Sequence, residues 1–253
     1  FLDKSGSKQC HFVKVDDLAA WRNTGEAIDG TIPSSRITAT EWNFTVGKST
    51  ALFEKLSRMT VKLGNVARIF QGLVTGADKV FVLEETAPPK SGLIRTKDQD
   101  GIDWLLEREI LRPFLNNVTV LTFERPVSHH WLIFPYRLYG KKADLIQGEE
   151  ISNSYPQVWD YLKNKSSILR GREGGKWNHE KWYAFGRNQN LTEMEEPKLI
   201  VQVISQEGRY AYDDMNIYFT GGGNGPYYGV RWREGNNPHS LYYLQALLNS
   251  RLL

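Results

Sequence analysis

The sequence predicts an α+β fold in which a mostly β body is flanked by helices, and we expect no complete Rossmann-type core. Short apolar segments bounded by turn residues are typical of strands. Towards the end of the chain such segments follow one another at 199–204, 210–212, 217–220 and 227–232. Longer segments with apolar residues at helical spacing predict helices. These segments lie at 49–63, 155–170 and 237–248.

Residues 1–46 are mixed in composition and rich in turn residues, which predicts a connector with one strand at 10–15. In the helix expected next, Ser49 or Thr50 can act as the cap, because a hydroxyl oxygen accepts a hydrogen bond from a free backbone N–H. The main domain is therefore expected at 47–253.

Two short apolar runs, 66–70 and 79–83, are separated by the loop 71–78, and together they predict a strand–turn–strand unit. Further along, the pattern predicts a short helix at 103–114 and a strand at 130–135.

The central helix, expected at 155–170, has Pro156 at its first position, where the missing N–H of proline costs nothing. The glycine-rich segment 171–177 predicts a loop directly after it. The pair Asn237-Pro238 is expected to begin the last helix.

Composition places the chain among globular proteins. Of its 253 residues, 40% are hydrophobic, enough for a sizeable core, and 24% are charged. Cys10 is the single cysteine, so neither an intrachain disulfide nor a cysteine-based zinc site can form, and a cytoplasmic location is expected. No apolar stretch approaches the length of a membrane span. The chain starts without methionine and stops at Leu253 inside an apolar helical pattern, so we expect a longer parent protein.

The net charge is only +3, but its distribution is uneven. Between residues 163 and 187 there are two acidic side chains and seven basic ones, so this window has a charge of +5 and the rest of the chain −2. The basic residues are Lys163, Lys165, Arg170, Arg172, Lys176, Lys181 and Arg187. A local concentration of positive charge is typical of a surface that binds a polyanion. Trp177, Trp182 and Tyr183 interleave with these charges, and each suits either a binding surface or the core.

Several segments match part of a catalytic motif, but none of them matches a complete one. Val46-Gly47-Lys48-Ser49 resembles the end of a phosphate-binding loop, but Trp42 stands where the first glycine is needed. The run 221–225 has the glycine spacing of S-adenosylmethionine sites, yet Pro226 and a β-rich segment follow it where a helix is needed.

The segment Glu196-Pro197-Lys198 matches half of a metal-dependent nuclease motif, but its proline interrupts the strand that such a site needs. His129, His130 and His179 lack partners at metal-ligand spacing. We therefore expect neither catalytic residues nor a metal site in this chain.

An ordered set of segments forms a more specific pattern. The most telling segment is 69–82, in which Gly72, Thr75, Gly76, Asp78 and Phe81 stand at the spacing G-x-x-T-G-x-D-x-x-F. The other segments are 42–44, 111–115, 131–136, 155–172, 182–187, 197–200 and 243–252. Together they resemble the C-terminal specificity region of TaqI-like adenine-N6 DNA methyltransferases, which also occurs in fused type II restriction–modification enzymes. The turn and the terminal helix are also similar to type I restriction specificity subunits.

The resemblance covers about residues 40–253 and implies a target-recognition domain that binds double-stranded DNA in a sequence-specific manner. Its parent would be a site-specific DNA adenine-N6 methyltransferase, with or without a fused endonuclease. The catalytic half, with its Asn-Pro-Pro-Tyr-type motif and its S-adenosylmethionine, would lie upstream, and residues 1–46 would connect the two halves. The fragment itself would be non-catalytic and without a cofactor.

In such a domain, phosphate contacts hold the duplex and base-edge contacts select the sequence. We assign the phosphate contacts to the seven basic residues of the 163–187 window, with Trp177 and Trp182 beside them. The first candidates for base reading are Arg172, Lys176 and Arg187, since arginine can pair with guanine through two hydrogen bonds. A second loop, 72–78, offers Gln71, Thr75 and Lys79 in or beside it, and a third loop, 221–233, offers Asn224, Arg231 and Arg233.

Other interpretations stay open at this point. A nuclease would use Glu196 and Lys198 together with an acid such as Asp213. A protein-interaction module would dock the terminal helix 241–253 onto a partner protein. An RNA-modifying relative would bind RNA in place of duplex DNA.

Overall fold

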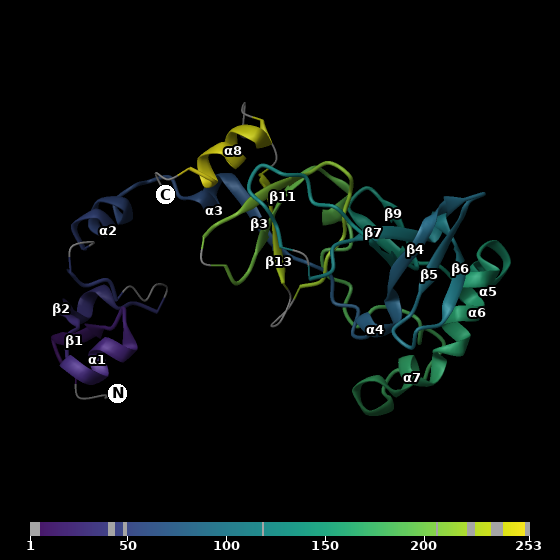
Figure 1. The fold of residues 1–253 in the computed structure, drawn as a ribbon, viewed down its shortest axis with the longest axis horizontal. Helices are drawn as coiled ribbons and strands as arrows, with labels where there is room; N and C mark the ends of the chain where they lie inside the picture. The colour runs from purple at the N-terminus through teal and green to yellow at the C-terminus, as the bar shows by residue number, and fades with distance from the viewer. Residues whose placement is uncertain are drawn as a thin grey trace. The chain divides into compact units, whose positions relative to one another are not determined.

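The computed structural model describes residues 6–39, 44–47, 50–117, 119–205, 207–221, 226–233 and 240–250. Contacts divide the chain into two compact units, residues 1–62 and 63–253. Both contain helices and antiparallel strand pairs, which confirms the predicted α+β class (Figure 1). Within the described part of the chain no parallel Rossmann-like sheet is formed.

The first unit contains a two-stranded antiparallel sheet of β1 (Gln9–Lys14) and β2 (Ile28–Pro33), joined through α1 (Leu18–Thr24). Asp17 caps α1, because its carboxylate accepts the N–H groups of Ala19 and Ala20. Gly25 ends the helix with φ of 72°, a conformation that glycine adopts without strain. The strand expected at 10–15 is confirmed, whereas α1 and β2 were not expected.

A single turn of 3-10 helix, η1 (Ser34–Arg36), follows β2, and α2 (Thr50–Ser57) comes later in the same unit. The helix expected at 49–63 is therefore confirmed, but it ends earlier than its apolar pattern predicts. Leu52 is 58% exposed and Phe53 45% exposed, so the apolar face of α2 is not buried within the described structure. The expected cap Ser49 lies outside the described residues.

In the second unit, five antiparallel strands form a sheet in the order β6-β5-β4-β8-β7. These strands are β4 (Val82–Lys90), β5 (Leu93–Lys97), β6 (Asp103–Glu107), β7 (Leu111–Phe114) and β8 (His130–Ile133). The strand at 130–135 is confirmed. The helix expected at 103–114 is wrong, because β6 pairs with β5 and β7 with β8 on either side of the 3-10 turn η3 (Arg108–Ile110).

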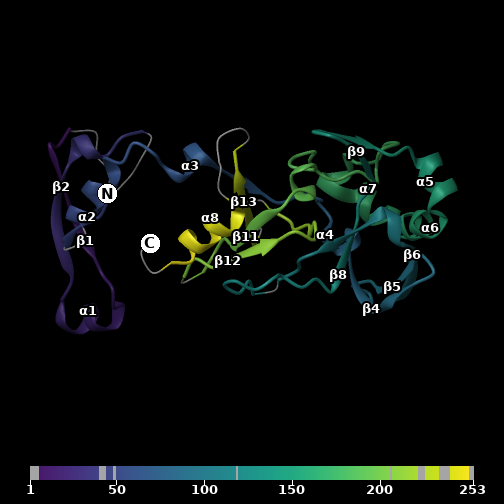
Figure 2. The ribbon, with the colours of Figure 1, turned by 90° about the horizontal axis from the view of Figure 1, so that it is seen from above.

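A second antiparallel sheet has the strand order β12-β11-β13-β3. Its strands are β3 (Ala67–Gln71), β11 (Lys198–Gln202), β12 (Tyr210–Asp213) and β13 (Tyr227–Trp232). The short helix α3 (Leu63–Val66) leads into β3, and α8 (Leu241–Leu248) packs against β11 and β12 (Figures 1 and 2). Ser240 caps α8, whereas the expected capping pair Asn237-Pro238 lies outside the described residues.

The strands expected at 199–204, 210–212 and 227–232 are confirmed. The segment 217–220 forms isolated bridges instead of a strand, through Tyr218 to Phe114 and Thr220 to Leu73. Because Phe114 belongs to the five-stranded sheet and Leu73 follows β3, this segment links the two sheets.

The strand–turn–strand unit expected at 66–83 is wrong. β3 pairs with β13 and β4 pairs with β5 and β8, so the two runs belong to different sheets. Between them, α4 (Asp78–Phe81) makes a single helical turn before β4 begins.

Three helices lie beside the five-stranded sheet (Figure 1): α5 (Gly148–Ser154), α6 (Pro156–Asn164) and α7 (Ser166–Gly175). The helix expected at 155–170 is confirmed, with Pro156 at its start and a break at Lys165. The Glu107 carboxylate accepts the N–H groups of Gln157 and Val158, each at 2.9 Å, and so binds β6 to the start of α6.

The expected loop at 171–177 is confirmed in part. Backbone angles leave the helical region at Arg172, and Glu173 and Gly174 have φ of 50° and 70°. The chain therefore turns sharply at the end of α7, before the segment that contains Trp177.

In the second unit, buried side chains from both sheets and from α4 to α7 form one large core, and a smaller separate cluster joins α8 to the four-stranded sheet. Phe81, Phe134, Phe185 and Tyr218 are fully buried, and Phe185 makes edge contacts with the rings of Phe81 and Phe134. The core therefore holds 184–187 against α4. A small hairpin of β9 (Tyr136–Tyr139) and β10 (Lys142–Leu145) lies at its side. No described helix has the length and apolar character to cross a membrane.

Candidate nucleic-acid interface

On one side, the loop 71–78 is bonded to the end of the 163–187 window and to residues just after it. The N–H of Gly186 donates to the Thr75 carbonyl oxygen at 2.8 Å, and the N–H of Arg187 donates to the Val74 carbonyl oxygen at 3.1 Å. The Asn190 side chain also donates to the Gln71 carbonyl oxygen at 2.9 Å. Two of the segments that the sequence analysis proposed for DNA contact are therefore joined.

On its other side the loop contacts the segment 217–221. Leu73 donates to the Phe219 carbonyl oxygen at 2.9 Å, and Gly221 donates to the Leu73 carbonyl oxygen at 2.8 Å. A Cβ on Gly72 would lie 2.3 Å from the Phe219 oxygen, and one on Gly221 would lie 2.2 Å from the Gly72 nitrogen. Only glycine permits this crossing, so all three proposed loops come together at 71–78.

Thr75 itself is fully buried. Its hydroxyl donates to the Asp78 carboxylate and accepts the Ala77 N–H at 3.1 Å, which shapes the turn into α4. The expectation that Thr75 contacts DNA is therefore corrected, because no face of its side chain reaches the surface. Gln71 and Lys79 do lie on the surface.

Arg172 was expected to read a base, but it is buried and bonded to the backbone. Its Nε donates to the Leu169 carbonyl oxygen, and Nη1 donates to that of Thr75, both at 2.9 Å. Nη2 donates to the carbonyl oxygens of Trp182 at 2.6 Å and Ala184 at 2.9 Å. Burial lowers the pKa of this guanidinium. Arg172 therefore holds the end of α7, the loop 71–78 and the segment 182–184 together, which corrects its proposed role.

Lys165 was also expected on the surface, but its side chain is buried. Its side chain is 7% exposed, and its Nζ lies 2.8 Å from the Asp98 carboxylate and 2.5 Å from that of Asp100. These carboxylates neutralise its charge, because both lie within direct hydrogen-bond distance. The proposed phosphate contact at Lys165 is corrected to an internal ion pair that joins the start of α7 to the turn between β5 and β6.

Two further basic residues of the window have internal partners but remain accessible. Lys163 is exposed and bonded to Asp160, one turn before it in α6, at 2.8 Å. Arg170 lies over the Trp182 ring at 5.0 Å and donates to the Asn178 side-chain oxygen at 3.1 Å. Pairs of this kind at the surface are weak and exchange readily with solvent or with a phosphate.

Three exposed cations of the window are free of internal ion pairs. Lys176, Lys181 and Arg187 are exposed, and no described carboxylate lies within ion-pair distance of them. Of the aromatic residues, Trp182 and Tyr183 are buried in the core, which corrects the proposed contact at Trp182. Trp177 remains half-buried, with Arg172 over its ring at 4.1 Å.

Trp177, Lys181 and Arg187 line one pocket with a volume of about 450 Å³. The rest of its wall is formed by Tyr136, Ala143, Asp144, Leu145, His179, Ala184, Phe185, Gly186 and Asn188. Several aromatic side chains, two cations and one carboxylate therefore line the same space. We call this the Trp177 pocket.

The third proposed loop contributes less. Arg231 is bonded to Glu193 at 2.6 Å and Glu196 at 2.7 Å, and its side chain is 13% exposed, so the expectation of a free DNA contact there is corrected. Arg233 is exposed, and its Nε donates to the Gly64 carbonyl oxygen at 2.9 Å. Asn224 lies outside the described residues.

Comparison with known proteins gives one informative similarity. The whole chain aligns over 268 residues, at 24% identity, with the type II restriction enzyme and methyltransferase RM.Eco57I of Escherichia coli. The chain spans 26% of that protein's length. No family model matches the sequence. The similarity supports an association of this chain with restriction–modification.

Two polar side chains of the Trp177 pocket, Tyr136 and Asn188, were not predicted from the sequence. Tyr136 donates from its hydroxyl to the Asn188 side-chain oxygen at 3.3 Å and accepts the Phe185 N–H at 2.8 Å. Burial raises the pKa of Tyr136 to about 12, so its hydroxyl keeps its proton at neutral pH. Asn188 is exposed, and its amide nitrogen has no partner among the described residues. The polar run directly after Arg187 was the signal in the sequence.

The residues of the nuclease interpretation are arranged as a structural ion pair. Lys198 lies 2.5 Å from Asp213, and neither side chain is exposed. Lys198 also donates to the Met194 carbonyl oxygen at 2.8 Å, whereas Glu196 faces solvent and bonds Arg231. Among the described residues no group of three His, Cys, Asp or Glu side chains could hold a metal ion. This geometry gives a substrate no access to Lys198 or Asp213.

Proposed function

We propose that this chain binds double-stranded DNA in a sequence-specific manner, as the target-recognition domain of a restriction–modification methyltransferase. The observation that supports this most directly is the Trp177 pocket, which is lined by Lys181, Arg187 and the exposed Asn188 amide together with Trp177. Similarity to a protein described as a restriction enzyme and methyltransferase supports the same class of function.

The pocket offers the two kinds of contact that DNA recognition needs. Lys181 and Arg187 are free cations, so phosphate oxygens can replace water around them at little desolvation cost. Asn188 presents an amide at the same surface, and asparagine can pair with the N6 and N7 atoms of adenine. The hydrogen bond from Tyr136 fixes the amide oxygen, and so it orients this side chain before DNA arrives.

The backbone behind the pocket is held by several hydrogen bonds. The loop 71–78 is bonded to the segment that contains Arg187, and Arg172 bonds four carbonyl oxygens beneath it. A preorganised surface of this kind loses little entropy on binding. We assign the methyl transfer, with its S-adenosylmethionine, to a separate catalytic domain of the parent protein, into which the target adenine would be flipped.

A salt titration tests the proposal. Binding of a fluorescent duplex to the full chain is measured by anisotropy between low and physiological salt, with the duplex pool first selected from random sequence. We expect the logarithm of affinity to fall linearly with the logarithm of salt. Lys181→Gln and Arg187→Gln should each weaken binding and reduce that slope by about 1.

The matched control is Lys90→Gln, an exposed lysine at the turn between β4 and β5 that does not line the Trp177 pocket. It loses the same charge, so a general electrostatic effect would lower the slope equally in all three variants. Equal effects, or affinity that does not depend on salt, would contradict the proposal. Tighter binding to RNA of the same sequence would favour the RNA interpretation.

A further inference from the structure

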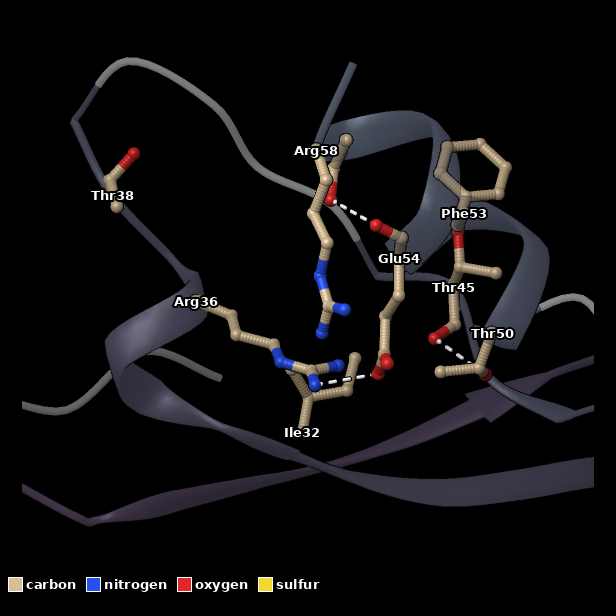
Figure 3. Close-up of a pocket in the computed structure, with 9 residues that line it drawn as sticks. Ile32, Arg36, Thr38, Thr45, Thr50, Phe53, Glu54 and Arg58 are labelled. Atoms are coloured by element: carbon tan, nitrogen blue, oxygen red, sulfur yellow. Dashed lines mark hydrogen bonds and ion pairs between the residues drawn. The ribbon is translucent and has the colours of Figure 1, made fainter. Parts of the chain in front are cut away.

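A second pocket, within the first unit, combines two arginines with an apolar floor. It has a volume of about 340 Å³, and Arg36, Glu54 and Arg58 reach into it from η1 and from the end of α2 (Figure 3). Ile32, which is buried, lies at its base, and Phe53 is exposed at its edge. All residues that line this pocket belong to residues 1–62, whereas the residues of the Trp177 pocket belong to residues 63–253.

The charges in this pocket do not balance. Arg36 Nη2 lies 2.6 Å from Glu54 Oε1, and Glu54 is the only acid among the described residues that line the pocket. No described carboxylate lies within ion-pair distance of Arg58, although Figure 3 shows its guanidinium directed towards that of Arg36. Two like charges that face one space repel each other unless an anion lies between them. The described residues that line the pocket carry a net charge of +1, which favours binding of an anion.

The geometry of the donors selects the kind of anion. A guanidinium presents several N–H groups in a plane, and two of them can bind adjacent oxygens of one phosphate group. Arg36 donates to Glu54 from one nitrogen, so its other N–H groups and those of Arg58 are available to a ligand. A phosphate offers acceptor oxygens on several sides and therefore suits donors that approach from two directions.

The neighbouring hydroxyl groups at the two ends of α2 are bonded within the chain. The Thr50 hydroxyl donates to the Gly47 carbonyl oxygen at 2.9 Å, and the Ser57 hydroxyl to that of Glu54 at 2.9 Å. Both hydroxyl protons are therefore used internally. Among the described residues that line the pocket, the two arginines therefore supply the charged donors for an anion, and Lys48 and Ser49 of the partial motif lie outside the described residues.

We propose that Arg36 and Arg58 form a binding site for a phosphate group, supplied either by a nucleic-acid backbone or by a free nucleotide. The inference does not depend on DNA binding by the second unit.

The test uses the full chain in a Lys181→Gln/Arg187→Gln background, so that phosphate bound in the Trp177 pocket does not contribute. Inorganic phosphate is titrated, and binding is followed by ³¹P line broadening and by thermal shift. We expect saturable binding, which Arg58→Gln weakens by about tenfold because the unpaired guanidinium is lost. Arg22→Gln is the matched control, since Arg22 is an exposed arginine of α1 that does not line the pocket.

Glu54→Gln gives an outcome that a purely structural role of these residues would not produce. It removes the competing carboxylate and raises the net charge of the pocket, so phosphate should bind more tightly than to the parent protein. Displacement of phosphate by duplex DNA identifies the backbone as the source, and tighter binding of a nucleoside monophosphate without displacement by DNA identifies a free nucleotide. Absence of saturable binding, or equal loss in Arg58→Gln and Arg22→Gln, overturns the inference.

Discussion

Arg172 and Thr75 are joined by a hydrogen bond of 2.9 Å from the guanidinium to the carbonyl oxygen, which connects the end of α7 to a loop 97 residues earlier in the chain. The same guanidinium donates to three more carbonyl oxygens. It therefore satisfies backbone acceptors that would otherwise need water or a neighbouring strand as a donor. The side chain is therefore a support for the DNA surface that we propose, although it does not belong to that surface.

Arg172→Gln tests this support. Glutamine cannot reach four carbonyl oxygens, and each buried carbonyl left without a partner costs free energy, so we expect the free energy of unfolding to fall by about 2–4 kcal/mol. Urea unfolding followed by tryptophan fluorescence measures the change. Lys176→Gln is the control, since that exposed side chain should alter stability by no more than about 0.5 kcal/mol. If Arg172→Gln left the free energy of unfolding unchanged but abolished the preference for the selected DNA sequence, the result would contradict the structural role and support base reading by Arg172.

The ion pair of Lys165 with Asp98 makes stability depend on pH at both extremes. Burial alone would raise the pKa of Asp98, but hydrogen bonds from Lys165, Ile102 and Trp104 outweigh it and hold that pKa below its usual value. Burial alone would lower the pKa of Lys165, but hydrogen bonds to Asp100 and Asp98 outweigh it and raise that pKa.

The sign of each effect follows by linkage. Asp98 stabilises the fold above its unfolded pKa of about 4, and this stabilisation is lost as the pH falls through the lower folded value. Lys165 stabilises the fold below its unfolded pKa of about 10.4, and this is lost as the pH rises through the higher folded value. Urea midpoints across the pH range should show a loss in both directions. Lys165→Met should remove the alkaline loss, and an unaltered alkaline profile in that variant would refute the assignment.

The pair also shows why the basic window could be found in the sequence but its accessible part could not. Lys163 and Lys165 are two residues apart and chemically equal, yet one is exposed and the other is buried. The difference arises from Asp98, which lies in the turn between β5 and β6, far away in the sequence. Spacing along the chain gives the sign and density of charge, whereas tertiary contacts decide which charges remain free.

Secondary structure shows the same limit. The helix at 155–170 could be predicted because Pro156 and the apolar spacing agree with its tertiary environment. The segment 103–114 is rich in leucine, glutamate and arginine, which favour helices, but pairing of β6 with β5 and of β7 with β8 overrides that preference. Convergence of the three proposed loops at Gly72 and Gly221 depends on a backbone crossing, which no local pattern encodes.

Lys198 and Asp213 give a prediction about the second sheet. Burial lowers the pKa of Lys198, and its attraction to Asp213 opposes that shift. Lys198→Met leaves a buried carboxylate without its partner, so the free energy of unfolding should fall by about 3–5 kcal/mol. In Lys198→Met/Asp213→Asn the charge is gone, and the asparagine oxygen can still accept the Ile217 N–H, as Asp213 does at 3.0 Å. The double variant should therefore regain part of the loss in urea unfolding. A double variant less stable than the single one would show that the charge is not the cause.

Asn188 offers the most direct test of sequence selection, and this prediction depends on the proposed function. Its amide lines the Trp177 pocket. Removal of a base-edge contact reduces the discrimination between DNA sequences, whereas the attraction of the protein to the DNA phosphates is unchanged. Asn188→Ala should therefore weaken binding of the selected duplex by about 1–3 kcal/mol while random DNA binds as before and the salt slope is unchanged. Competition anisotropy with the two duplexes measures the ratio.

Tyr136→Phe is the companion variant, because it removes only the hydroxyl that bonds Asn188 and the Phe185 N–H. It should produce a smaller loss of discrimination in the same direction, since the amide would still be present but less firmly oriented. Lys181→Gln should give the opposite pattern, with weaker binding of both duplexes and an unaltered ratio. If Asn188→Ala and Lys181→Gln lowered affinity for both duplexes equally, the pocket would hold the backbone alone, and selection would have to come from another surface, with Gln71 and Lys79 as the next exposed candidates.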